Sequence, residues 1–171
     1  SMLSLDTNLQ VTVLADQIPG GYNWSSNRPE VLRIWRRGTL ISYLRLLHEC
    51  FKRSGCSKIL IELEWGLLGR NPLILGMFPP FLCVLKLLGK KVYVVAHGIS
   101  LDFLPLAPQL GLSSGSLVAA LFDVGIRLFY LFLVVFSEKV IVLEKYFAVL
   151  INKNFNTQKA VFIPHGVDTS L

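Results

Sequence analysis

A histidine and a glycine stand where one buried strand is expected to end. His97 and Gly98 directly follow Val92–Ala96, a continuous apolar run. An imidazole at that position can donate a hydrogen bond to a sugar hydroxyl or a phosphate, and a glycine beside it lets a ligand approach the backbone closely. The alternative is a loop histidine that only orders its own turn. We favour the functional interpretation, because the position of the histidine and the neighbouring glycine agree.

Acidic residues lie at the end of a second expected strand, Lys58–Glu62, and just after it. Glu62 and Glu64 share a face if the segment is extended, and paired carboxylates can bind hydroxyls or serve as acid and base. For Glu62 we favour a structural role. For Glu64 two interpretations have equal weight: it binds a ligand, or it accepts hydrogen bonds from backbone amides and shapes the glycine loop that follows. The tryptophan in that loop either stacks on a sugar ring or packs. The further candidates in the loop are Trp65, Gly66 and Gly69.

Two more candidate positions lie toward the C-terminal end. Glu144 follows the apolar run Val140–Leu143, and it is equally explained as a helix N-terminal residue favoured by the helix dipole. Pro164 and Gly166 indicate a sharp turn after a strand. In that turn His165 and Asp168 either line a cleft or begin a linker.

Alternating strands and helices must position these residues. The expected strands are Val11–Ala15, Val31–Trp35, Lys58–Glu62, Val92–Ala96, Val140–Leu143 and Ala160–Ile163, and the expected helices are Leu40–Arg53, Pro72–Leu88, Leu117–Phe136 and Glu144–Asn152. Thr39 is expected to cap the first helix, and Pro79-Pro80 to interrupt the second. The first helix should bury the stripe Leu40, Tyr43, Leu44, Leu47 and Phe51.

Continuous apolar strands that alternate with helices indicate an α/β fold. The sheet is expected to be parallel, doubly wound and Rossmann-like, with helices on both faces. Ligands in such sheets bind at the carboxyl ends of the strands. The candidate residues should therefore gather at one edge of the sheet.

Composition narrows the classes of function. The 171 residues suit a single domain over residues 2–171, and 53% are hydrophobic against 16% charged, so some apolar surface is expected to meet a membrane or another domain. The net charge of +6 suits phosphate-bearing partners, but dispersed basic residues without a recognised motif disfavour nucleic acid. Three cysteines without metal-ligand spacing predict neither a disulfide framework nor a metal site, and a cytoplasmic location is the default.

Several well-known signatures are missing from the sequence. No GxGxxG follows a strand and no GxxxxGK[ST] occurs, which disfavours nicotinamide dehydrogenases and P-loop NTPases. No GxSxG is present, which disfavours an α/β-hydrolase.

Four segments, in their order, resemble the N-terminal domain of GT-B glycosyltransferases of the GT4-like group, which includes glycogen synthases and mannosyltransferases. QVTVLAD resembles the second strand of that domain, and IELEWGLLG resembles its glycine-loop segment. VYVVAHGIS resembles the strand that ends in a histidine, and VIVLEKY with VFIPHGVD resembles the closing run. Together they cover nearly the whole chain.

This resemblance implies one half of a GT-B fold that binds the sugar acceptor. A C-terminal domain would bind the donor, a UDP- or GDP-sugar, and the glycosyl group would be transferred with retention of configuration and without a metal. By position, His97 matches the histidine that contacts the reacting sugar, Glu64 the loop carboxylate, and Gly66 and Gly69 the loop glycines. Trp65, Gly98 and Glu144 are expected on the acceptor side, and His165, Gly166 and Asp168 where the chain crosses to the second domain.

The sequence also departs from the family pattern. The family opens with a strand, a glycine loop and a helix that have no counterpart before Gln10, and its donor domain would begin where this chain ends. Glu62 and Glu144 replace a glutamine and a serine. We therefore expect the chain alone not to transfer sugar. The alternative is a non-catalytic, membrane-associated subunit that binds acceptor and recruits a separate catalytic chain.

The segment Leu117–Phe136 is long enough to span a bilayer. Asp123 and Arg127 are four residues apart and can pair, and two central charges argue against an isolated span. We favour a crossover helix, then in-plane membrane contact, which Leu73–Leu88 would extend. In-plane contact would suit a lipid-linked acceptor and a peripheral location on the cytoplasmic membrane face.

Overall fold

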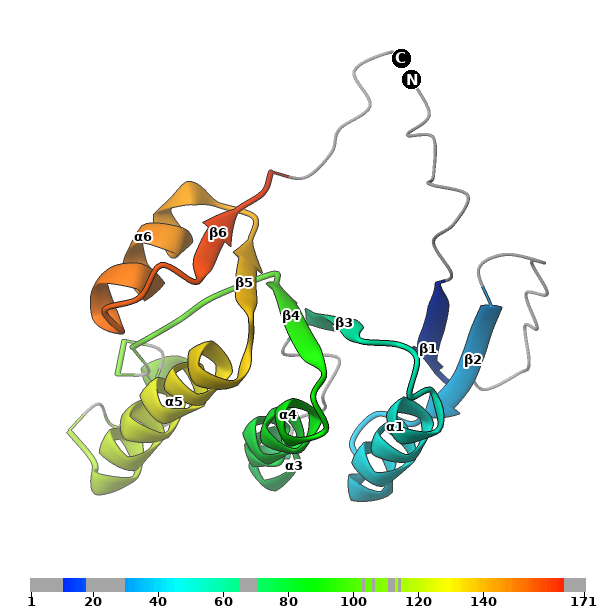
Figure 1. Ribbon diagram of the computed structural model, residues 1–171. Helices are drawn as coiled ribbons and strands as arrows, with labels where there is room; N and C mark the ends of the chain where they lie inside the picture. Colours follow the sequence, from blue (N-terminus) through cyan, green and yellow to red (C-terminus); the bar gives the residue numbers. More distant parts are fainter. Residues whose placement is uncertain are drawn as a thin grey trace, which may run out of the picture.

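Parallel strands form the centre of the molecule. The computed structural model describes residues 11–17, 30–64, 71–102, 104–105, 107–110, 113 and 115–164. Strands β1 (Thr12–Asp16) and β2 (Glu30–Trp35) pair with each other, and a second sheet has the order β3 (Lys58–Leu63), β4 (Lys91–Ala96), β5 (Lys139–Val142), β6 (Ala160–Phe162) (Figure 1). Every pairing is parallel. The predicted α/β fold with parallel sheets is confirmed.

Helices connect these strands. They are α1 (Leu40–Lys52), α3 (Pro72–Gly76), α4 (Phe78–Leu87), α5 (Leu117–Phe136) and α6 (Lys145–Asn154), with a short 3-10 helix at Ala107–Leu110. The break predicted at Pro79-Pro80 lies instead at Met77, because both prolines occupy the first turn of α4, where a missing N–H costs nothing. Thr39 stands at the start of α1 but does not cap it through its side chain; its hydroxyl donates to the Arg36 carbonyl, 2.9 Å away.

The described helices cover one face of the four-stranded sheet. Alternate residues such as Val94 and Val142 are buried in the core cluster, together with residues of α1, α4, α5 and α6. On the other face, Leu60, Tyr93 and Ile141 are not part of that cluster. The connections from β3 through β6 all run in one direction along the sheet, so right-handed crossovers place their helices on one face. The predicted covering of both faces is therefore not found among the described residues.

The sheet is interrupted between β1 and β3. Among the described residues, β1 pairs only with β2, and β3 pairs only with β4. Figure 1 shows β1 between β2 and β3, so that the unpaired edges of β1 and β3 are neighbours. A strand edge presents N–H and C=O groups that can pair with a further strand.

Helix α1 buries a different side from the one predicted. Leu40, Leu44 and Phe51 are exposed, whereas Tyr43 and Cys50 are buried. The prediction of a buried Leu40–Phe51 stripe is therefore wrong for three of its five members. The helix packs against β2 on one side and α4 on another, and these neighbours, which periodicity does not reveal, decide which side is covered.

Tyr43 links α1 to α3. Its hydroxyl donates to the Ile74 carbonyl at 2.9 Å, and burial raises the pKa of Tyr43 from 10.0 to about 12.

We expect Tyr43→Phe to lower the free energy of unfolding at neutral pH by about 1 kcal/mol. Because the folded pKa is the higher one, the contribution of the neutral hydroxyl is complete below pH 10 and is lost as the pH rises through about 12. Urea unfolding across that range should show the difference between the two proteins shrinking, and a constant difference would contradict it. Tyr146→Phe, at an exposed site, is the control.

Lysine side chains bind the carbonyl groups that two helices leave unpaired at their C-terminal ends. The Lys159 Nζ donates to the carbonyls of Val134 and Ser137, each at 2.9 Å, after α5 turns toward β5. Burial, and then the nearby Lys86, lower the pKa of Lys159. Lys90 binds three carbonyls in the turn just after α1, those of Arg53, Ser54 and Cys56. These contacts fix the ends of two helices against the sheet.

Candidate functional site

Three of the predicted site residues stand at the carboxyl ends of adjacent strands. Ala96, the last residue of β4, pairs in register with Leu63 of β3 and with Val142 of β5. Glu64 and His97 therefore come directly after neighbouring strand ends, and Glu144 follows two residues after the third. The His97 N–H donates to the Leu63 carbonyl at 3.1 Å, which extends the pairing by one step.

The side chains at this edge are open to solvent. Glu64, His97 and Glu144 are all exposed. Carboxylates accept hydrogen bonds and an imidazole can donate or accept them, so each of these groups is able to bind a sugar hydroxyl. Glu62 is also exposed, within β3, where it pairs in register with Val95.

The loop after His97 is held by a tyrosine that sequence reasoning missed. The hydroxyl of Tyr130, from α5, donates to the Gly98 carbonyl and accepts from the Ser100 N–H, both at 3.4 Å. Tyr130 is fully buried. A Cβ added at Gly98 would meet no atom of the described residues within 4 Å, and the φ of this glycine is not positive. The described part of the fold therefore does not require glycine at this position.

Glu144 precedes helix α6 and occupies its N-cap position. Its backbone is extended, with φ −130°, and its carbonyl accepts from the Phe147 N–H at 3.2 Å. Its side chain makes no capping hydrogen bond. The position fits the helix-dipole interpretation, and it also leaves the carboxylate available to a ligand at the edge of the sheet.

The remaining predicted residues lie outside the described part of the chain. These are Trp65, Gly66 and Gly69 in the loop after β3, and His165, Gly166 and Asp168 after β6. Their placement in the site stays a prediction.

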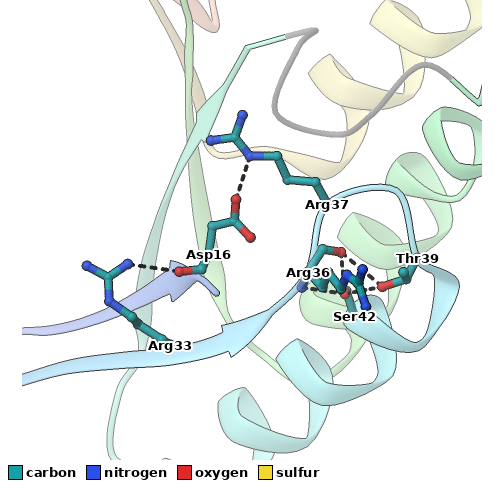
Figure 2. Close-up of polar contacts among 6 residues, drawn as sticks. All are labelled: Asp16, Arg33, Arg36, Arg37, Thr39 and Ser42. Carbon is teal, nitrogen blue, oxygen red and sulfur yellow. Dashed lines mark hydrogen bonds and ion pairs between the residues drawn. The ribbon is translucent and has the colours of Figure 1, made fainter. Parts of the chain in front are cut away.

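A second polar cluster, which the sequence analysis did not single out, follows β1 and β2. Figure 2 shows Asp16, the last residue of β1, held between two arginines. The Arg37 Nε lies 2.5 Å from Asp16 Oδ2, and Arg33 donates to the Asp16 carbonyl at 2.9 Å. Asp16 Oδ1 is buried and has no hydrogen-bond partner among the described residues. The signal available in the sequence was Asp16 directly after one expected strand, with Arg33 inside the next expected strand and Arg37 after it.

The turn that carries Arg37 is fixed by hydroxyl groups. Ser42 Oγ donates to the Arg36 carbonyl at 2.7 Å and accepts from the Arg36 N–H at 2.9 Å (Figure 2). Gly38 has φ +72°, a conformation that favours glycine. Arg37 is half exposed despite its ion pair. A guanidinium presented in this way can bind an anionic group such as a phosphate.

A pocket of about 290 Å³ adjoins the cluster around Asp16, between α1 and β2, and shares Arg33 with it. The pocket is lined by Gln17, Arg33, Ile34, Arg45, His48 and Glu49. Of the predicted site residues that the structure describes, Glu64, His97, Gly98 and Glu144, none lines it. Within the described ranges, no group of three or more His, Cys, Asp or Glu side chains could hold a metal ion.

Among the helices that the structure describes, α5 is the one long and apolar enough to cross a membrane, and 28% of its most apolar stretch is buried.

Comparison with known proteins gives no match. No protein-family model matches the chain, and no curated protein and no solved structure matches it. Any function must therefore be argued from the residues and their arrangement.

Proposed function

We propose that this chain is the acceptor-binding domain of a retaining glycosyltransferase that uses a nucleotide sugar. The observation that carries the proposal is the row formed by Glu64, His97 and Glu144 at adjacent strand ends. Ligands of parallel sheets bind at this edge. In the proposal, the imidazole of His97 contacts the reacting sugar, the two carboxylates accept hydrogen bonds from acceptor hydroxyls, and Gly98 leaves room for the ring.

The interrupted sheet supports the same proposal. The family that the sequence resembles opens with a strand and a helix, which would precede β1. A strand between β1 and β3 would use both unpaired edges. The connection from that added strand to β1 would run along the sheet in the direction opposite to the connections from β3 to β6. A right-handed crossover in that direction would place the connecting helix on the uncovered face of the sheet. The complete domain would then be the doubly wound half of a GT-B fold.

The other parts of the enzyme belong to the proposal as well. The UDP- or GDP-sugar donor would bind to a C-terminal domain, reached through the segment of His165, Gly166 and Asp168. No metal takes part in this scheme. The acceptor is either a soluble sugar or a lipid-linked one.

The exposed apolar side of α5 favours a second candidate. In it, the chain is a membrane-associated subunit that binds acceptor but leaves the transfer to a separate catalytic chain. The two candidates share the acceptor site and differ in whether transfer needs a partner.

The test is transfer of labelled sugar by the protein expressed from its complete gene. Tritiated UDP-glucose, UDP-N-acetylglucosamine and GDP-mannose would each be incubated with soluble sugars, polyprenyl phosphate and polyprenyl-diphosphate sugars, with EDTA present. We expect labelled product from one of these donors. Product that forms only after a separate chain is added would select the subunit. No product from any donor, with or without added membranes of the source cell, would contradict both candidates.

A further inference from the structure

Helix α5 is apolar on its outward side along its whole length. Leu117, Leu121, Val124 and Leu128 recur every three or four residues, and Phe132 and Val135 continue the same stripe. All six are exposed, Leu117 by 76% and Leu121 by 63%. The opposite side of the helix buries Phe129, Tyr130 and Leu133 in the core. A helix that is apolar on both sides is typical of a buried environment rather than of a water-exposed surface.

The charged residues of α5 do not interrupt that stripe. Asp123 is buried, and Arg127 donates to it at 3.0 Å and also lies 2.7 Å from Asp102. The predicted Asp123–Arg127 pair is thus confirmed, and it lies to the side of the stripe. Because one side of α5 packs in the core, the helix is placed to lie along a membrane surface rather than across it.

The neighbouring helices extend the apolar surface. The outward residues of α3 and α4 include Leu73 at 75% exposure and Leu87 at 81%, with Met77 and Val84 between them. Helix α4 packs directly on α5, where Phe78 and Phe129 stack with ring centroids 5.8 Å apart. Figure 1 shows α5, α3 with α4, and α1 in a row on one side of the strands. We call this outward surface of α1, α3, α4 and α5 the helical face.

Exposed cations border the helical face. On α1, Arg45 and Lys52 are exposed and follow the exposed Leu44 and Phe51 in the sequence, and Arg45 also lines the pocket at β2. On α4, Lys86 is exposed and donates to the Val135 carbonyl of α5. The acidic residues of the same helices are Glu49 and Asp123, and each is paired with an arginine. The face therefore combines a wide apolar surface with uncompensated positive charge at its border.

We propose that the helical face binds in the plane of an anionic lipid bilayer. Apolar side chains of α3, α4 and α5 enter the boundary between headgroups and acyl chains, and Arg45 and Lys52 contact anionic headgroups. This charge arrangement favours a bilayer over a second copy of the chain, which would bring like charges together. The inference does not depend on sugar transfer; if both hold, the acceptor site lies beside a membrane that carries lipid-linked sugars.

The experiment is co-sedimentation of the protein with vesicles of phosphatidylcholine alone or with one third phosphatidylglycerol, without any nucleotide sugar. We expect binding to the anionic vesicles that weakens at high salt. Leu121→Gln combined with Leu128→Gln should reduce the partition coefficient by about tenfold or more. Arg45→Gln with Lys52→Gln should reduce it by about tenfold on anionic vesicles only.

The matched control is Tyr146→Gln combined with Val149→Gln. Both side chains are exposed and largely apolar but lie on α6, away from the helical face. These changes should leave vesicle binding unchanged, and circular dichroism should show every variant folded. The proposal is overturned if neither vesicle binds the protein, or if the leucine variants bind as well as the parent. It is also overturned if sedimentation velocity shows a dimer that the leucine variants dissociate, because the face would then be a self-association surface.

Discussion

His97→Ala is expected to lower sugar transfer by at least about 100-fold, the range for loss of a positioned acid–base or hydrogen-bonding group. The melting temperature should stay nearly unchanged, because the side chain is exposed and the backbone bond to Leu63 is kept by alanine. The measurement is the initial rate of labelled product formation beside a thermal unfolding curve. It is made on the protein expressed from its complete gene.

A matched histidine provides the control for that variant. His48 is exposed on α1 and lines the pocket at β2 rather than the strand-end edge. His48→Ala should change the transfer rate by no more than about twofold. If His97→Ala lost stability and activity together, His97 would be a structural residue of its loop, and if it kept full activity, His97 would have no role in the transfer.

Lys90→Met is expected to lower the free energy of unfolding by about 2–3 kcal/mol. The ammonium of Lys90 donates to the carbonyls of Arg53 at 3.0 Å, Ser54 at 3.3 Å and Cys56 at 2.7 Å, and the residue is only 8% exposed. Methionine fills similar space but cannot donate, so the carbonyls of Ser54 and Cys56 would lose this donor, and that of Arg53 would keep the Cys56 N–H. Urea unfolding at neutral pH measures the loss.

Lys86→Met separates the effect of this cluster from the loss of one charge. Lys86 is exposed and donates to a single carbonyl, that of Val135, at 2.9 Å. Its replacement should cost less than about 1 kcal/mol. Equal stability of wild-type protein and Lys90→Met would show that water satisfies these carbonyls as well as the lysine does.

The order of elements could be predicted because it is written in local patterns. Short β-branched runs such as Val92–Ala96 became strands, and α5 has the predicted limits Leu117–Phe136. One error arose where distant contacts decide, because the buried side of α1 depends on β2 and α4. The misplaced helix break near Pro79 was a local error, since proline is favoured in the first turn of a helix.

The same distinction applies to the candidate site. That Glu64, His97 and Glu144 would share an edge follows from topology alone, since carboxyl ends of parallel strands meet. The contacts of Tyr130 with Gly98 and of Arg37 with Asp16 join residues 32 and 21 positions apart, and no spacing rule predicts them. They became visible only in the folded chain.

The central claim, that sugar ligands bind at the edge of Glu64, His97 and Glu144, is tested most directly by nuclear magnetic resonance. The ¹⁵N-labelled protein would be titrated with glucose 1-phosphate, mannose 1-phosphate and N-acetylglucosamine 1-phosphate as soluble fragments of an acceptor. We predict that the largest amide shifts fall on Glu64, His97, Gly98 and Glu144, and that His97→Ala weakens them. Shifts centred instead on Gln17, Arg33 and His48, or no shifts with any of the three ligands at millimolar concentration, would contradict the assignment of this edge as the acceptor site.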